Sequence, residues 1–149
     1  MTLENILRTG LSYYPFLVIR NWAKGEKAAI EKELKEKKFD LIHAETFYVM
    51  PHIPQTQIPI LLVEQTIEHL VYRHFAEESK KFLLKPFLYF DVFKMKYWEL
   101  KYWNKAKKVV AMSEDDKEKM LDEVGSLDVG IVPNGVDSDY FSKKVADKS

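Results

Sequence analysis

The sequence has 149 residues, of which 46% are hydrophobic and 31% are charged, a balance typical of one globular domain rather than a disordered chain. Its 23 basic and 23 acidic side chains give a formal net charge of zero, which argues against a general nucleic-acid binder, because such proteins carry a basic excess. The absence of cysteine excludes disulfides, thiolate catalysis and cysteine-bound zinc. The sequence also shows no secretory signal and no apolar run long enough to span a membrane, and together these features predict a cytoplasmic protein.

The first half of the chain predicts two helices followed by two short buried strands. Residues 3–14 predict a short helix or a partly ordered lead-in that stops near Pro15. Residues 16–38 predict one longer helix, because apolar side chains recur there at helical spacing among lysines and glutamates. Residues 39–44 and 58–63 are apolar runs typical of buried strands, and a loop containing prolines joins them.

The second half continues the alternation of helices and strands. Residues 65–79 and 86–105 predict helices, and residues 108–112 predict a third strand. Ser113, followed directly by acidic residues, predicts the N-terminal cap of a helix that ends near Gly125.

A fourth short strand is predicted over residues 129–132, before a turn and a polar tail. Short apolar strands that alternate with helices predict an α/β fold, in which a parallel sheet is flanked by helices. We expect residues 1–141 to form one partial domain and residues 142–149 to form the tail.

Polar side chains follow each of the four predicted strands. The carboxyl ends of parallel strands meet at one edge of a sheet, and ligands of open α/β folds bind beyond that edge. An equally open interpretation is that loops are polar in general and that a serine there only caps a helix. The candidate binding residues are His43 and Glu45, Glu64 and Gln65, Ser113, and Asn134.

Four segments at these positions resemble glycosyltransferase family 4. They follow one another in the order, and at about the spacing, that the family shows, which argues against chance similarity. The most specific is the last, a Pro-Asn-Gly-Val-Asp segment with a phenylalanine after it. The segments are residues 39–45 (FDLIHAE), 63–68 (VEQTIE), 110–116 (VAMSEDD) and 131–141 (IVPNGVDSDYF).

This resemblance implies part of the Rossmann-like N-terminal domain of a GT-B enzyme, in which two domains face a cleft. The implied activity is transfer of a sugar from a nucleotide-sugar donor to an acceptor hydroxyl. Gln65 stands where the family often has histidine, and glutamine can bond a hydroxyl but cannot shuttle a proton, so no catalytic residue is assigned. The residues implied on the acceptor side are His43, Glu45, Glu64 and Gln65, with Ser113 and Asn134 near the mouth of the cleft.

The sequence has no counterpart of the family's donor-binding groups. None of its five glycines forms a Gly-x-Gly phosphate loop, and no two glutamates lie eight positions apart, as they do in the family's nucleotide-sugar domain. We therefore expect a fragment that is inactive alone, binds no cofactor, and meets the nucleotide-sugar donor only together with the missing domain or a separately encoded remainder of the enzyme. The expected acceptor is a sugar or a lipid-linked glycan.

The histidines and one aromatic segment bear on two other kinds of site. The histidines (His43, His52, His69 and His74) lack the spacing of metal ligands, so no metal site is expected. Residues 82–103 combine many aromatic side chains with lysines, and such a helix either packs against the sheet with its lysines reaching solvent, which is the favoured interpretation, or lies on the inner face of a membrane. The membrane alternative implies a rival function, a non-enzymatic α/β adaptor that binds a membrane or protein partner through this helix.

Overall fold

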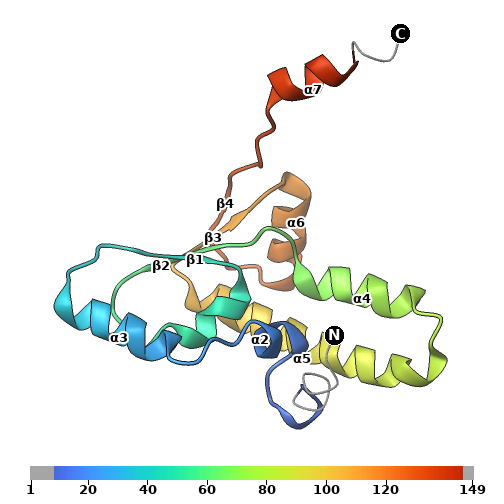
Figure 1. Cartoon of the computed structure of the whole chain (residues 1–149), viewed down its shortest axis with the longest axis horizontal. Coiled ribbons are helices and arrows are strands. Elements are labelled where there is room, and N and C mark those ends of the chain that lie inside the picture. Colours follow the sequence, from blue (N-terminus) through green and yellow to red (C-terminus); the bar gives the residue numbers. More distant parts are fainter. Residues whose placement is uncertain (1–8, 146–149) are drawn as a thin grey trace.

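The computed structural model describes residues 9–145, and its centre is a parallel sheet of four strands in the order β1-β2-β3-β4 (Figure 1). The strands are β1 (Ile42–Glu45), β2 (Ile60–Val63), β3 (Lys108–Ala111) and β4 (Val129–Ile131). Each pairs in parallel with the next. The predicted α/β fold with a partial Rossmann-like sheet is thus confirmed, and all four predicted strands are present with slightly shorter or shifted ends.

Helices make up most of the remaining chain within residues 9–145. They are α2 (Phe16–Arg20), α3 (Glu26–Glu36), α4 (Glu68–Glu78), α5 (Lys85–Lys105), α6 (Glu114–Glu123) and α7 (Ser138–Val145), with short 3-10 turns η1 (Phe47–His52) and η2 (Phe82–Leu84). η1 lies within the loop predicted between the first two strands. Of the helix predicted over residues 3–14, residues 9–11 are helical and residues 3–8 lie outside the described part of the chain.

The two faces of the sheet differ in what covers them. Side chains alternate between the faces of a strand, and the register places the buried Ala44, Leu62 and Val109 side by side across three strands. Helices α2, α3 and α5 lie on one side of the strands in Figure 1. His43 and Glu45 alternate with Ala44 and are exposed, so they belong to the opposite face.

The core lies between the sheet and the helices. Its largest fully buried side chains include Phe47 and Met50 from η1, Met95 and Trp103 from α5, and Leu62 from β2. Each such burial contributes on the order of 2 kcal/mol to folding. The short turn η1 and the long helix α5 are therefore held on the same core as the sheet.

The helix predicted over residues 16–38 is interrupted, so this prediction was wrong. α2 ends at Arg20, and Gly25 has a left-handed backbone (φ 85°) directly before α3. Glycine adopts this conformation without steric cost, and it stops a right-handed helix. The helical repeat of apolar residues continues across the break, which is why the pattern predicted a single element.

Helices α4 and α5 pack together as a hairpin that extends beyond the sheet (Figure 1). One side of the C-terminal half of α5 is buried, with Trp98, Tyr102 and Trp103 in the core, so the favoured interpretation of core packing is confirmed for that side. Its N-terminal half leaves Tyr89 and Phe93 exposed. Within residues 9–145, no helix is both apolar enough and long enough to cross a bilayer.

The last predicted helix begins as the sequence indicated. Ser113 caps α6, because its hydroxyl oxygen accepts a 3.1 Å hydrogen bond from the backbone N–H of Asp116. After β4 the chain leads to α7, which extends away from the sheet in Figure 1. This helix crosses the expected boundary at residue 141, so the first four residues of the predicted tail are helical, and residues 146–149 lie outside the described part.

Candidate functional site

Three candidate residues lie beyond the carboxyl ends of three adjacent strands. Gln65 follows β2, Ser113 follows β3 and Asn134 follows β4. The side-chain amide of Asn134 donates a 3.4 Å hydrogen bond from Nδ2 to Oε1 of Gln65, so residues far apart in the sequence meet at this edge. Both amides are exposed, and Ser113 is half-buried. This edge therefore presents two amide groups to solvent, whereas the hydroxyl of Ser113 donates a 2.7 Å hydrogen bond to a carboxylate oxygen of Asp116 on α6.

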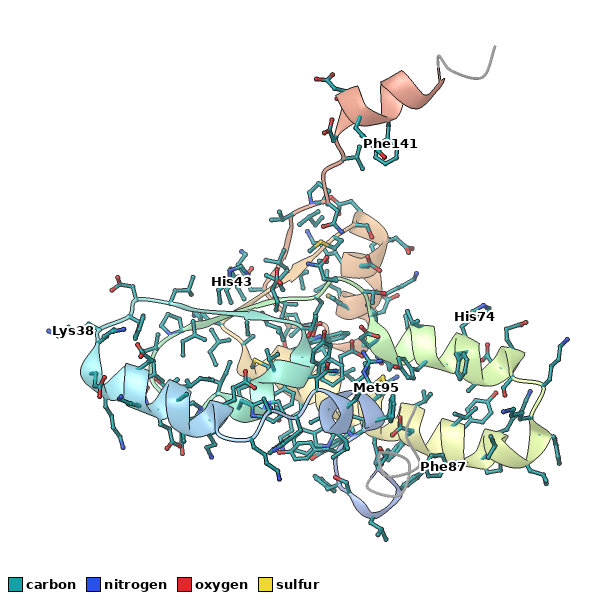
Figure 2. The ribbon with its side chains drawn as sticks, viewed as in Figure 1. Lys38, His43, His74, Phe87, Met95 and Phe141 are labelled. Carbon is teal, nitrogen blue, oxygen red and sulfur yellow. The ribbon has the colours of Figure 1, made fainter. Side chains whose placement is uncertain are left out.

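His43 and Glu45 lie on β1, at one edge of the sheet. Glu45 is the last residue of β1 and pairs with Val63, the last residue of β2. Glu45 therefore lies at the same end of the sheet as Gln65. His43 lies two residues earlier on β1, opposite Leu61 of β2. Figure 2 shows His43 on the side of the strands away from α3. Both are exposed and open to a ligand on that face.

Glu64 differs from the other candidates because it is buried, with only 1% of its surface exposed. One carboxylate oxygen accepts a 3.1 Å hydrogen bond from the indole N–H of Trp103, and the other accepts a 3.3 Å hydrogen bond from the backbone N–H of Phe47. Burial, and then the nearby charge of Glu99, raise the pKa of Glu64 well above its ordinary value. The carboxyl group thus points into the core, where it connects β2, η1 and α5.

Thr46 lies between the exposed Glu45 and the first residue of η1. Its backbone has φ 67° and ψ 150°, and it is the only residue other than glycine with positive φ in the described part of the chain. This region of backbone space is strained for a β-branched residue. Its buried hydroxyl has no hydrogen-bond partner among the described residues. The hydrogen bond from Phe47 to Glu64 holds the chain directly after this strained residue.

A second buried carboxylate organises the start of α4. Glu99, fully buried on α5, accepts hydrogen bonds from the backbone N–H groups of Glu68 (2.8 Å) and His69 (3.0 Å), which are the first two of that helix. It also lies 2.6 Å from Nδ1 of His69. The other ring nitrogen of His69 is 3.7 Å from Glu123, which pairs with Lys96. Glu99 thus caps α4 from another helix.

This arrangement includes three residues that were not predicted for the site, Thr46, Glu99 and His69. No local signal marks them, because a glutamate inside a helical pattern usually faces solvent and a threonine after a strand usually begins a loop. Only the packing of α5 under the end of β2 brings these groups together. Among residues 9–145, no group of three histidine, aspartate or glutamate side chains is arranged to hold a metal ion.

A known family matches most of the chain. The family model described as Glycosyltransferase Family 4 matches residues 3–140, which span all four strands and every candidate residue. No curated protein and no solved structure matches the chain. Because the family model covers nearly the whole sequence, the chain belongs to glycosyltransferase family 4.

Proposed function

We propose that this chain supplies acceptor-binding groups of a glycosyltransferase that moves a sugar from a nucleotide-sugar donor to an acceptor hydroxyl. The observation that carries the proposal is the 3.4 Å contact between the amides of Asn134 and Gln65, with Ser113 following the strand between them. Exposed amides suit a sugar, because an amide and a sugar hydroxyl can each both donate and accept hydrogen bonds. Family membership favours this function over a non-enzymatic adaptor.

The residues divide into two roles in this proposal. Glu45 and His43 are exposed and would contact acceptor hydroxyls from the side of β1. Glu64 would act as a positioning residue, because its hydrogen bond to the N–H of Phe47 holds the turn that directly follows Glu45. Gln65 would orient the acceptor without taking a proton, since a side-chain amide neither gains nor loses a proton near neutral pH.

The donor would be bound by groups outside these residues. The sequence offers neither a glycine-rich phosphate loop nor the paired glutamates of the family's nucleotide-sugar site. We therefore expect the isolated chain to bind acceptor sugars weakly and to transfer none. A donor-binding domain, on the same or another polypeptide, would complete the cleft.

A heteronuclear NMR titration with methyl glycosides of glucose, galactose and mannose tests the proposal. The side-chain amide signals of Gln65 and Asn134 should shift together with one of these sugars, and Asn134→Ala should weaken that binding by roughly tenfold. UDP-glucose added to the same sample should cause no saturable shift. The matched control is Asn104→Ala, which removes an exposed amide on α5 and should leave binding unchanged.

Two results would count against the proposal. One is sugar-induced shifts that map to a surface away from the ends of β2, β3 and β4. The other is an equal loss of binding in Asn134→Ala and Asn104→Ala. Sugar transfer from UDP-glucose by the purified chain alone would contradict the assignment of the donor site to another part of the enzyme.

A further inference from the structure

The tip of the α4–α5 hairpin exposes three consecutive large apolar side chains. Phe82 and Leu83 are 80% and 89% exposed, and Leu84 is also exposed. All three belong to η2, the turn that joins the two helices at the end of the hairpin away from the sheet (Figure 1). Single exposed apolar residues are normal, but a contiguous group on a projecting turn indicates a surface that contacts another phase or molecule.

Lysines flank this group on both sides. Lys80 and Lys81 precede it and are exposed, and Lys85 follows it. The ammonium of Lys85 donates a 2.9 Å hydrogen bond to the carbonyl oxygen of Glu77, at the end of α4, and keeps its charge near the tip. No acidic residue lies within residues 79–85, and of the two exposed acids just before them, Glu77 and Glu78, the first pairs with Arg73. The tip therefore combines an apolar centre with a positive rim.

The exposed side of α5 continues this character away from the tip. Tyr89, Phe93 and Tyr97 are spaced by four residues, so they lie along one side of the helix, and all are exposed. Lys101 continues the same spacing, with its ammonium 4.3 Å from the ring centroid of Trp98. Tyrosine and phenylalanine next to lysine are the side chains found where a helix meets a lipid headgroup region.

We propose that this tip, residues 80–85, docks on an anionic lipid bilayer, with Phe82 and Leu83 inserted among the acyl chains and the lysines on the headgroups. Charge complementarity favours this occupant, because anionic lipids attract each nearby lysine. A second copy of the chain is disfavoured, since a symmetric contact between two tips would set lysines against lysines. The inference does not depend on the proposed sugar transfer.

The structure also corrects which lysines can take part. Lys94 lies within residues 82–103, the segment that the sequence offers for membrane contact, but it is buried. Its ammonium donates hydrogen bonds to the carbonyl oxygens of Thr9 (2.7 Å) and Tyr14 (3.2 Å) and lies 3.6 Å from Asp91. Replacing Lys94 would disturb the fold, so it is unsuitable as a test of lipid binding.

Cosedimentation with vesicles tests the proposal, using phosphatidylcholine with and without phosphatidylserine. The chain should bind the vesicles that contain phosphatidylserine, and added salt should weaken that binding. The loss of one lysine should weaken binding to these vesicles about fivefold, so the double variant Lys80→Glu with Lys81→Glu should bind them more than tenfold more weakly. Phe82→Ser with Leu83→Ser should reduce binding by at least tenfold. Both pairs are exposed, so thermal unfolding should be unchanged.

Matched controls lie at the other end of the molecule. Lys35→Glu with Lys38→Glu makes the same charge change near the end of α3, and Lys38 lies far from the hairpin in Figure 2. Phe39→Ser with Leu41→Ser removes two exposed apolar side chains before β1. Both controls should bind as the unchanged chain does.

Three outcomes would overturn the proposal. The first is equal sedimentation with and without phosphatidylserine, or none with either. The second is unchanged binding by both tip variants. The third is a tip variant that abolishes self-association in light scattering, which would identify the occupant as a second copy.

Discussion

The indole N–H of Trp103 donates a 3.1 Å hydrogen bond to a carboxylate oxygen of Glu64, and so joins the last turn of α5 to the residue directly after β2. The second oxygen of Glu64 accepts from the N–H of Phe47, at the start of η1. One buried carboxyl group thus connects three elements that are distant in sequence. It also lies beside the edge of the sheet where the exposed candidate residues are found.

Replacing Glu64 with alanine should destabilise the fold strongly. The variant leaves two buried N–H groups without acceptors and opens a cavity, so the free energy of unfolding should fall by about 3 kcal/mol. Urea unfolding followed by circular dichroism measures this. Glu45→Ala, which removes an exposed carboxylate at the end of β1, should change stability by no more than about 0.5 kcal/mol. Similar losses in the two variants would show that Glu64 has no special structural role.

The raised pKa of Glu64 also predicts a dependence on pH. A carboxyl group whose pKa is higher in the folded chain than in the unfolded chain contributes its full share to the free energy of unfolding at pH below the ordinary pKa of 4.5. This contribution is lost as pH rises from 4.5 toward the pKa of the folded chain. Glu64→Gln cannot ionise. The difference in the free energy of unfolding between the unchanged chain and Glu64→Gln should therefore shift against the unchanged chain as pH rises from 4.5.

Urea unfolding of both proteins at several pH values above 4.5 checks this expectation. Subtracting one stability curve from the other removes the titration of groups that the two proteins share, including Glu68 and Asp91, whose pKa values burial also raises. A difference that is independent of pH would mean that Glu64 ionises in the folded chain as easily as in the unfolded one.

Glu99→Gln should loosen the beginning of α4. The amide keeps one oxygen acceptor for the N–H groups of Glu68 and His69 but places an NH2 group where the second oxygen stood. Hydrogen–deuterium exchange should quicken in the first turn of α4, and stability should fall by about 2 kcal/mol. Glu77→Gln, which alters an exposed pair with Arg73 on the same helix, serves as the control and should leave exchange there unchanged.

Thr46→Gly should stabilise the protein. Glycine adopts the observed positive φ without strain, and the change removes a buried hydroxyl that lacks a partner, so we expect a gain of about 1 kcal/mol in the free energy of unfolding. Thr66→Gly changes the same residue type at a position without positive φ and should lose about 1 kcal/mol, because glycine has more freedom in the unfolded chain. A fall in the free energy of unfolding in both variants would show that the backbone at Thr46 is not strained.

Several features were readable from the sequence because their causes are local. The strand ending at Val63 is a continuous apolar run, and Ser113 followed by acidic residues is a cap that needs no distant partner. The break at Gly25 was missed, since an apolar repeat at helical spacing does not report a single left-handed residue.

The candidate site was readable only in part. The sequence indicated that polar residues follow the strands, because parallel strands share one carboxyl edge, and Gln65 and Asn134 do meet there. It grouped Glu64 with these exposed residues, although that side chain is buried. A residue directly after a strand can turn either way, and its direction depends on what packs beneath it.

By itself, then, the sequence determined the α/β alternation, the strand segments, the cap of α6 and the resemblance to a sugar-transferring family, since each rests on short-range periodicity or on motifs. Tertiary structure alone decided that Glu64 and Glu99 are buried acceptors and that the hairpin tip at Phe82 stays uncovered. The physical reason is that burial and hydrogen bonding depend on contacts between elements far apart in the chain. Local residue pattern does not encode which elements will meet.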